Sequence, residues 1–185
     1  MGKYKKDWWE KAKQFQVPLL NENDLREMLK KCKDKEERII LILLYYTGAR
    51  PQEILELRVR DIKKERNRIA ISIPTLKKGI GRRIFIPLNE ITQELISFVE
   101  ESPIPDLKLI LKWRHSHNIR FFVYRVSDNR LTPYFFRHNR LSQLANEGVD
   151  PHTLKRFKGA KSILSVDTYL QLAGVGLKEI VKKIK

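Results

Sequence analysis

Residues 39–53 have the sequence I-I-L-I-L-L-Y-Y-T-G-A-R-P-Q-E, which predicts two helices separated by a sharp turn. The apolar residues belong to a helix that we expect over about residues 35–46, and the glycine at Gly48 ends it. Pro51 favours the first turn of a new helix. Arg50 therefore lies at a helix N-terminus, where backbone N–H groups and the helix dipole favour an anion. We predict that Arg50 helps to form a phosphate site.

Most of the chain on either side has helical patterns, and one region is rich in β-forming residues. Two short runs within residues 61–88 predict an antiparallel hairpin, and a further short strand is expected over Phe121–Val126. Besides the two helices above, we expect one helix that begins near Asn21. Further helices are expected over about residues 91–99, 133–147, 151–157, 162–170 and 175–184. The fold class is mainly α with a small antiparallel β-sheet (α+β). Residues 1–20 are expected to form an N-terminal arm or linker, and residues 21–185 one domain.

The charge balance indicates a polyanionic partner. Among 185 residues, 38 are Lys or Arg and 22 are Asp or Glu, which gives a formal net charge of +16. Nucleic acid is the partner that such an excess favours, because each neutralised phosphate releases counterions. The longest apolar run, Ile39–Tyr46, is too short to span a bilayer, and no signal peptide is evident, so we expect an intracellular protein. The single cysteine, Cys32, excludes an internal disulfide and a cysteine-based metal site.

Several motifs follow one another in an order typical of a known family. The stretch T-G-A-R-P-Q-E (47–53) resembles the T-G-x-R-x-x-E box of tyrosine recombinases, also called integrases. A hairpin with lysines at its tip, L-T-P-Y-F-F-R-H (131–138), E-G-V-D (147–150), Lys158-Gly159 and Tyr169 then match the family in order. The resemblance covers roughly residues 20–185. It implies the fold of a tyrosine recombinase catalytic domain, which acts on double-stranded DNA without a metal or another cofactor.

The resemblance also assigns the site residues. Arg50, the hairpin Lys77, Arg137 and the nucleophile Tyr169 match the family pattern. Lys78 is an alternative for the hairpin position, and we prefer Lys77 because the spacing from it to Gly81 and Arg83 matches the hairpin of the family.

Two positions depart from the pattern. Tyr134 stands where the family has the His of H-x-x-R, and a phenol, with a solution pKa near 10, is a poor proton shuttle at neutral pH. Ala160 stands where the family has His or Trp, and the adjacent Lys161 is a candidate for the missing hydrogen-bond donor.

These residue types suit a metal-free transesterification. We expect the guanidinium groups of Arg50 and Arg137 to clamp the phosphate, with Glu53 bracing Arg50. Lys77 would protonate the leaving 5′ oxygen, and Tyr169 would attack phosphorus to form a 3′-phosphotyrosine.

The sequence leaves three functions open. The preferred one is site-specific recombination by the catalytic half of a two-domain enzyme, of a type found in archaeal viruses or plasmids. The others are a type IB topoisomerase and a DNA-binding protein that has lost catalysis. An apolar stripe over residues 177–184 predicts a C-terminal helix. The resemblance implies that this helix docks on a neighbouring subunit, within a tetramer on DNA, and packing against its own core is the alternative.

Overall fold

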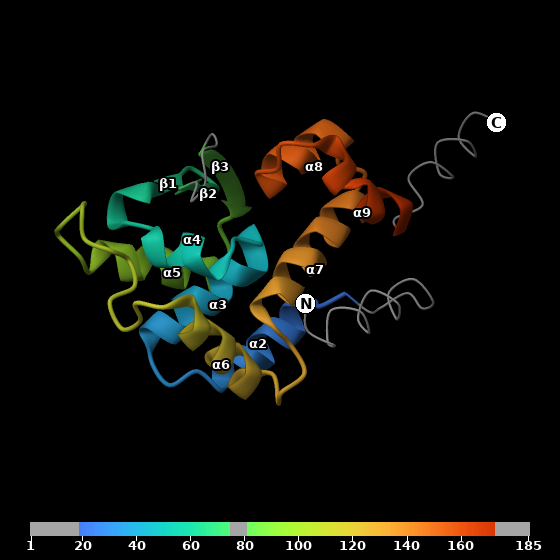
Figure 1. The fold of residues 1–185 in the computed structure, drawn as a ribbon. Coiled ribbons are helices and arrows are strands. Elements are labelled where there is room, and N and C mark those ends of the chain that lie inside the picture. The colour runs from blue at the N-terminus through green and yellow to red at the C-terminus, as the bar shows by residue number, and fades with distance from the viewer. Residues whose placement is uncertain (1–18, 75–80, 173–185) are drawn as a thin grey trace.

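The computed structural model describes residues 19–74 and 81–172 and shows helices around one small sheet (Figure 1). Strands β1 (Ile62–Glu65), β2 (Arg68–Ile73) and β3 (Arg82–Pro87) form a three-stranded antiparallel sheet in the order β1-β2-β3. The α-helices are α2 (Glu22–Lys30), α3 (Lys35–Thr47), α4 (Pro51–Glu56), α5 (Glu90–Glu100), α6 (Ser116–Val126), α7 (Pro133–Asn146), α8 (Pro151–Lys158) and α9 (Asp167–Leu172). Two 3-10 turns are η1 (Val59–Asp61) and η2 (Ile163–Ser165). This architecture confirms the predicted fold class.

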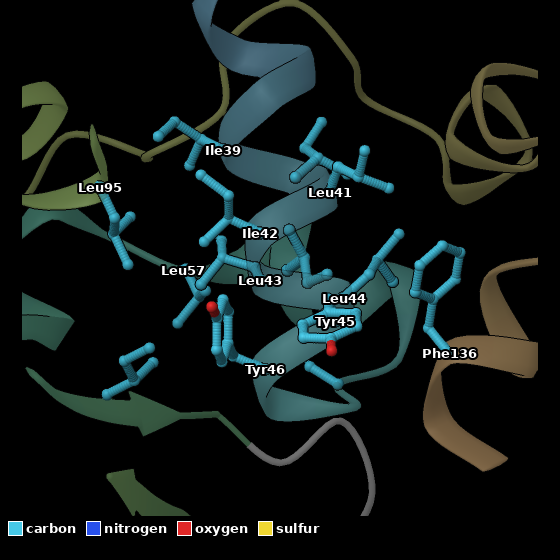
Figure 2. Packing of buried hydrophobic residues seen from close by; sticks show 14 of the residues in the cluster. Ile39, Leu41, Ile42, Leu43, Leu44, Tyr45, Tyr46, Leu57, Leu95 and Phe136 are labelled. Carbon is cyan, nitrogen blue, oxygen red and sulfur yellow. The ribbon is translucent and has the colours of Figure 1, made fainter. Parts of the chain in front are cut away.

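Helix α3 forms the centre of the hydrophobic core. Every residue from Ile39 to Thr47 is buried, as expected for a helix that is apolar on all of its faces. Figure 2 shows its side chains packed among Leu57, Leu95 and Phe136, which follow α4 or lie on α5 and α7. The other elements therefore take their positions from α3.

The C-terminal end of α3 is shaped by Gly48. This residue has φ +56°, a left-handed conformation that glycine adopts without steric cost. A Cβ atom here would lie 3.3 Å from the Cα of Arg137, so glycine also permits the close approach of α7. The same turn therefore ends α3 and brings α7 next to residue 50.

The sheet presents its two faces with strict alternation along β3. Ile71 pairs with Ile84 and Ile73 pairs with Arg82. Arg82 and Ile84 are buried, whereas Arg83 is exposed. Because successive side chains of a strand point to opposite faces, Arg82 lies on the inner face of β3. Helix α8 packs against this strand.

Two predictions about local structure differ from the structure. The strand expected over Phe121–Val126 is wrong, since these residues form the second half of α6. The buried residues of α6, Ile119, Phe122, Val123 and Val126, recur every three or four positions, so tertiary packing selects a helix although the residues also suit a strand. The helix expected over residues 162–170 is divided into η2 and α9.

Some expectations fall outside the part of the chain that the structure describes. These are the arm up to residue 18, both candidate lysines at the hairpin tip, and the C-terminal helix over residues 175–184. Within the described ranges, no helix is both long and apolar enough to cross a membrane.

Replacing Phe136 by alanine should destabilise the fold strongly. Its side chain is fully buried in the core, and Phe→Ala at such a site costs about 3–5 kcal/mol. Phe121→Ala on α6 is the matched control, because Phe121 is 69% exposed and its loss should cost less than about 1 kcal/mol. Urea unfolding measures both. Equal losses of stability in the two variants would contradict the assignment of the core.

Candidate active site

Arg50 occupies the N-cap position of α4, as the sequence predicts. Its backbone N–H donates to Oε2 of Glu53 at 2.8 Å, and its guanidinium donates to Oε1 at 2.7 Å. The side chain of Arg50 is 40% exposed. The arginine is thus held by Glu53 but still accessible to an anion.

Glu53 is the buried carboxylate of the site, with a side chain that is only 1% exposed. Besides Arg50, it accepts two hydrogen bonds from the guanidinium of Arg82, at 3.1 and 2.7 Å. Burial alone would raise the pKa of Glu53, but the hydrogen bonds and charge of Arg82, with those of Arg50, lower it to about 2. Glu53 therefore stays ionised and joins α4 to β3.

Arg137 lies in the second turn of α7 and connects distant segments of the chain. Its Nη1 donates to the carbonyl of Gly48 at 2.8 Å, and its Nη2 donates to the carbonyl of Lys158. Burial, and then the positive charges of Arg50 and Arg82, lower its pKa to about 10. It still carries a full charge at neutral pH. Three guanidinium groups therefore meet in one region.

Tyr169 lies on α9, within a small buried cluster beside α7 and α8. It packs with Leu141, Leu144, Leu154 and Val166 and is 2% exposed. Burial raises the pKa of its phenol to about 12, although Arg137 opposes the shift. Its oxygen makes a 2.6 Å hydrogen bond with Nδ1 of His138 on α7. The phenol of Tyr169 is therefore covered by α7 and α8 and held against an imidazole.

Lys158 and Gly159, at the end of α8, bring this helix to the arginines. The ammonium of Lys158 donates to the carbonyl of Ser165 and lies 5.1 Å from the centre of the Tyr169 ring. Burial, with the charges of Arg137 and Arg50, lowers the pKa of Lys158 to about 8. Gly159 has φ +63°, and a Cβ atom there would lie 3.0 Å from the guanidinium of Arg82.

The structure brings together three of the residues that the sequence selects. Arg137 interacts electrostatically with both Arg50 and Tyr169. Tyr134 lies on the first turn of α7 and is half exposed, and Lys161 is exposed after the end of α8. The predicted hairpin residue Lys77, and its alternative Lys78, lie outside the described residues.

Sequence reasoning missed two cations of this region. The alignment of the hairpin with the family pattern selects Arg83. In the structure, Arg83 pairs with Glu65 on the outer face of the sheet. The inner-facing residue is Arg82, and the alternation of Ile84 and Ile86 with exposed neighbours was the signal for it. The sequence analysis uses Lys158 only as part of the Lys158-Gly159 match to the family and assigns it no role in the site. Among the residues that the structure describes, no group of three or more His, Cys, Asp or Glu side chains could hold a metal ion.

Comparison with known proteins identifies the family. The sequence profile of the phage integrase family matches residues 18–174. The chain therefore belongs to the phage integrase family, and the resemblance to tyrosine recombinases is confirmed.

Its relatives include archaeal tyrosine recombinases. Tyrosine recombinase XerA of Saccharolobus solfataricus is 26% identical over 88% of this chain and 55% of its own length. XerA of Pyrococcus furiosus is also 26% identical, over 89% of this chain and 60% of its own length. The chain thus spans little more than half the length of these relatives.

Solved structures show the same fold. The crystal structure of XerA recombinase matches with a TM-score of 0.68 at 19% identity, over 91% of this chain and 65% of that one. The catalytic domain of bacteriophage HP1 integrase matches with a TM-score of 0.60 at 20% identity, over 90% of this chain and 94% of that domain. The fold is that of a tyrosine recombinase catalytic domain.

Replacing Glu53 by glutamine should destabilise the protein by about 3–5 kcal/mol at pH 7, because the buried Arg82 loses its counter-charge. The wild-type contribution should also depend on pH. The pKa of Glu53 falls from an ordinary 4.5 to about 2, so its stabilisation is complete above pH 4.5 and is lost as the pH falls toward 2. This shift corresponds to about 3 kcal/mol. Urea unfolding across this range measures it, and E53Q should lack this component.

The matched control is Glu65→Gln. Glu65 also pairs with two arginines, Arg68 and Arg83, but is partly exposed. Its replacement should cost less than about 1 kcal/mol. If Glu65→Gln lowered the free energy of unfolding as much as E53Q does, burial would not be the reason for the large contribution of Glu53 to stability.

Proposed function

We propose that the chain is the catalytic domain of a site-specific DNA recombinase that cleaves and rejoins DNA through a 3′-phosphotyrosine at Tyr169. The convergence of Arg50, Arg137 and Tyr169 carries this proposal. These residues come from α4, α7 and α9, which are far apart in the sequence, and their side-chain types suit one reaction.

Positive charge in the site favours a phosphodiester. Arg50 and Arg137 carry guanidinium groups, whose forked donors match phosphate. The region holds a surplus of positive charge because the single carboxylate of Glu53 faces three arginines, Arg50, Arg82 and Arg137. As phosphorus becomes five-coordinate, charge grows on its nonbridging oxygens, and donors that are already in place stabilise it without reorganisation. A solved relative, the XerH site-specific recombinase, is described as bound to a difH substrate in a post-cleavage complex.

The remaining roles follow the family pattern. Tyr169 attacks phosphorus, and Lys77 protonates the leaving 5′ oxygen. Tyr134 donates a hydrogen bond to the phosphate. Lys161 supplies the donor that is missing at Ala160, and Lys158 is an alternative because it lies beside the Tyr169 ring. On this proposal the reaction uses no metal or other cofactor.

The assembly and setting also belong to the proposal. Recombination joins two duplexes, which requires several copies of the chain, and we propose a tetramer on DNA with the C-terminal helix docked on a neighbour. A DNA substrate implies a location inside the cell. The Y-x-x-R variant and the archaeal relatives favour an element of an archaeal virus or plasmid.

Two other functions remain candidates. A type IB topoisomerase would use similar residues to relax supercoils without exchanging partners. A DNA-binding protein without catalysis is favoured by Tyr134 and Ala160 and by the buried state of Tyr169. Exchange between two duplexes separates a recombinase from a topoisomerase.

Tyr169→Phe should abolish the covalent adduct and leave DNA binding unchanged. A nicked suicide duplex traps the adduct, because the released fragment diffuses away, and a denaturing gel resolves it. Tyr124→Phe on α6 is the control and should react like the wild type, since Tyr124 is placed outside the site. An adduct that persists in Y169F would show that another residue is the nucleophile. No adduct from the wild type would support the DNA-binding alternative.

Binding to duplex DNA should weaken steeply with salt. If six or more phosphates are neutralised, raising the salt from about 50 to about 200 mM lowers affinity by about 10³-fold or more. Fluorescence anisotropy with labelled DNA measures this slope. A salt-independent affinity would contradict a binding surface built from the surplus Lys and Arg.

A further inference from the structure

The nucleophile at Tyr169 needs a group that takes its proton. A phenol attacks phosphorus effectively only as it loses its proton, and burial makes this loss harder here. Lys77, in its proposed role, gives a proton to the leaving oxygen and cannot accept one in the same step. The family position for a proton shuttle on α7 holds Tyr134, which suits this task poorly.

His138 is the imidazole that contacts the reacting oxygen. Its Nδ1 lies 2.6 Å from the hydroxyl of Tyr169, and the two ring centres are 5.7 Å apart. The contact joins α7 to α9, which pack on each other. A distance of 2.6 Å lies within the range that direct proton transfer requires.

The place of His138 on α7 explains how an imidazole can accept the proton of Tyr169 although Tyr134 replaces the histidine of the family. The two residues are four positions apart on α7, so they lie on the same face of the helix, one turn from each other. Arg137 lies between them in the sequence and is directed to Gly48 and Lys158. The chain therefore has an imidazole one turn beyond the usual position, and this imidazole contacts the nucleophile.

The other ionisable groups around Tyr169 suit the role less well. The ammonium of Lys158 lies over the face of the ring and already donates to Ser165. Arg137 stays protonated at neutral pH. Asp167, on α9 itself, is exposed and accepts a hydrogen bond from Gln171.

We propose that His138 is the general base of the cleavage step, an inference that rests on the proposed function. The proton of the Tyr169 hydroxyl passes to Nδ1 of His138 while the phenolic oxygen forms its bond to phosphorus. The bond between phosphorus and the 5′ oxygen breaks, and the leaving oxygen takes a proton from Lys77. In rejoining, a 5′ hydroxyl attacks the phosphotyrosine and gives its proton to Lys77, while His138 returns its proton to the phenolic oxygen as the bond between that oxygen and phosphorus breaks.

The surrounding charges support this direction of transfer. Arg137 interacts electrostatically with Tyr169, and the ammonium of Lys158 lies 5.1 Å from the centre of the Tyr169 ring. The positive charge of Arg137 favours the deprotonated form of Tyr169 and so opposes the effect of burial on the pKa of this phenol.

His138→Asn tests the proposal. The amide oxygen of asparagine can accept the hydrogen bond near the position of Nδ1 but takes up no proton at neutral pH. Single-turnover formation of the adduct on the suicide duplex should be about 10²-fold slower than in the wild type. The wild-type rate should rise between about pH 5 and pH 8 as the imidazole loses its proton, and H138N should lack this rise.

A modified substrate separates the base from the acid. A 5′-bridging sulfur leaves as a thiolate and needs no proton, so it should restore cleavage by K77A but not by H138N. Added imidazole should restore part of the activity of H138A. His152→Asn on α8, which changes an exposed histidine, is the control and should match the wild type. Thermal melting and DNA binding of H138N should be unchanged.

The outcomes distinguish the inference from the function on which it rests. Wild-type rates and an unchanged pH profile in H138N would overturn the role of His138 as a base, as would rescue of H138N by the sulfur substrate. The proposed function would then still stand. An absence of adduct from the wild type would overturn the proposed function, and this inference with it.

Discussion

The buried carboxylate of Glu53, held between Arg50 and Arg82, is the interaction on which the site depends. It fixes the first turn of α4 and attaches β3 to it. Gly159 then packs on Arg82, which sets the end of α8, and the carbonyl of the preceding residue accepts a hydrogen bond from Arg137. One carboxylate thus organises segments that span more than half of the chain.

On the proposed function, this arrangement holds the phosphate-binding arginines in place before DNA binds. Burying guanidinium groups is costly, and the lowered pKa of Arg137 is a measure of that cost. The hydrophobic core around α3 stabilises the fold enough to offset this cost. The donors are then already in place and need not reorganise during the proposed reaction. Tyr169, the proposed nucleophile, is buried away from solvent beside His138 and Lys158. Of the three arginines, Arg50 is accessible to solvent, whereas Arg82 and Arg137 are buried behind it.

Much of the fold could be predicted from local sequence. The apolar run of α3, its end at Gly48 and the start of α4 at Pro51 are local signals, and they place Arg50 correctly. The segment Phe121–Val126 was misassigned because the same residues suit a strand or a helix, and packing against the core decides between them.

The inner part of the site could be predicted only in part. Tyr169 was selected by its order after Arg50 and Arg137. Which of Arg82 and Arg83 faces the core depends on the alternation of side chains along β3, and a shift of one residue in the register would exchange their faces. The contacts of Lys158 and His138 with Tyr169 depend on how α7, α8 and α9 pack, and no local pattern encodes that packing.

The central claim is that this site joins Tyr169 to a 3′ phosphate of DNA. The most direct measurement is mass spectrometry of the adduct after digestion with nuclease and protease. We predict one modified peptide, carrying a nucleotide linked through its 3′ phosphate to Tyr169. A nucleotide on any other residue, a linkage through a 5′ phosphate, or no modified peptide would contradict the account.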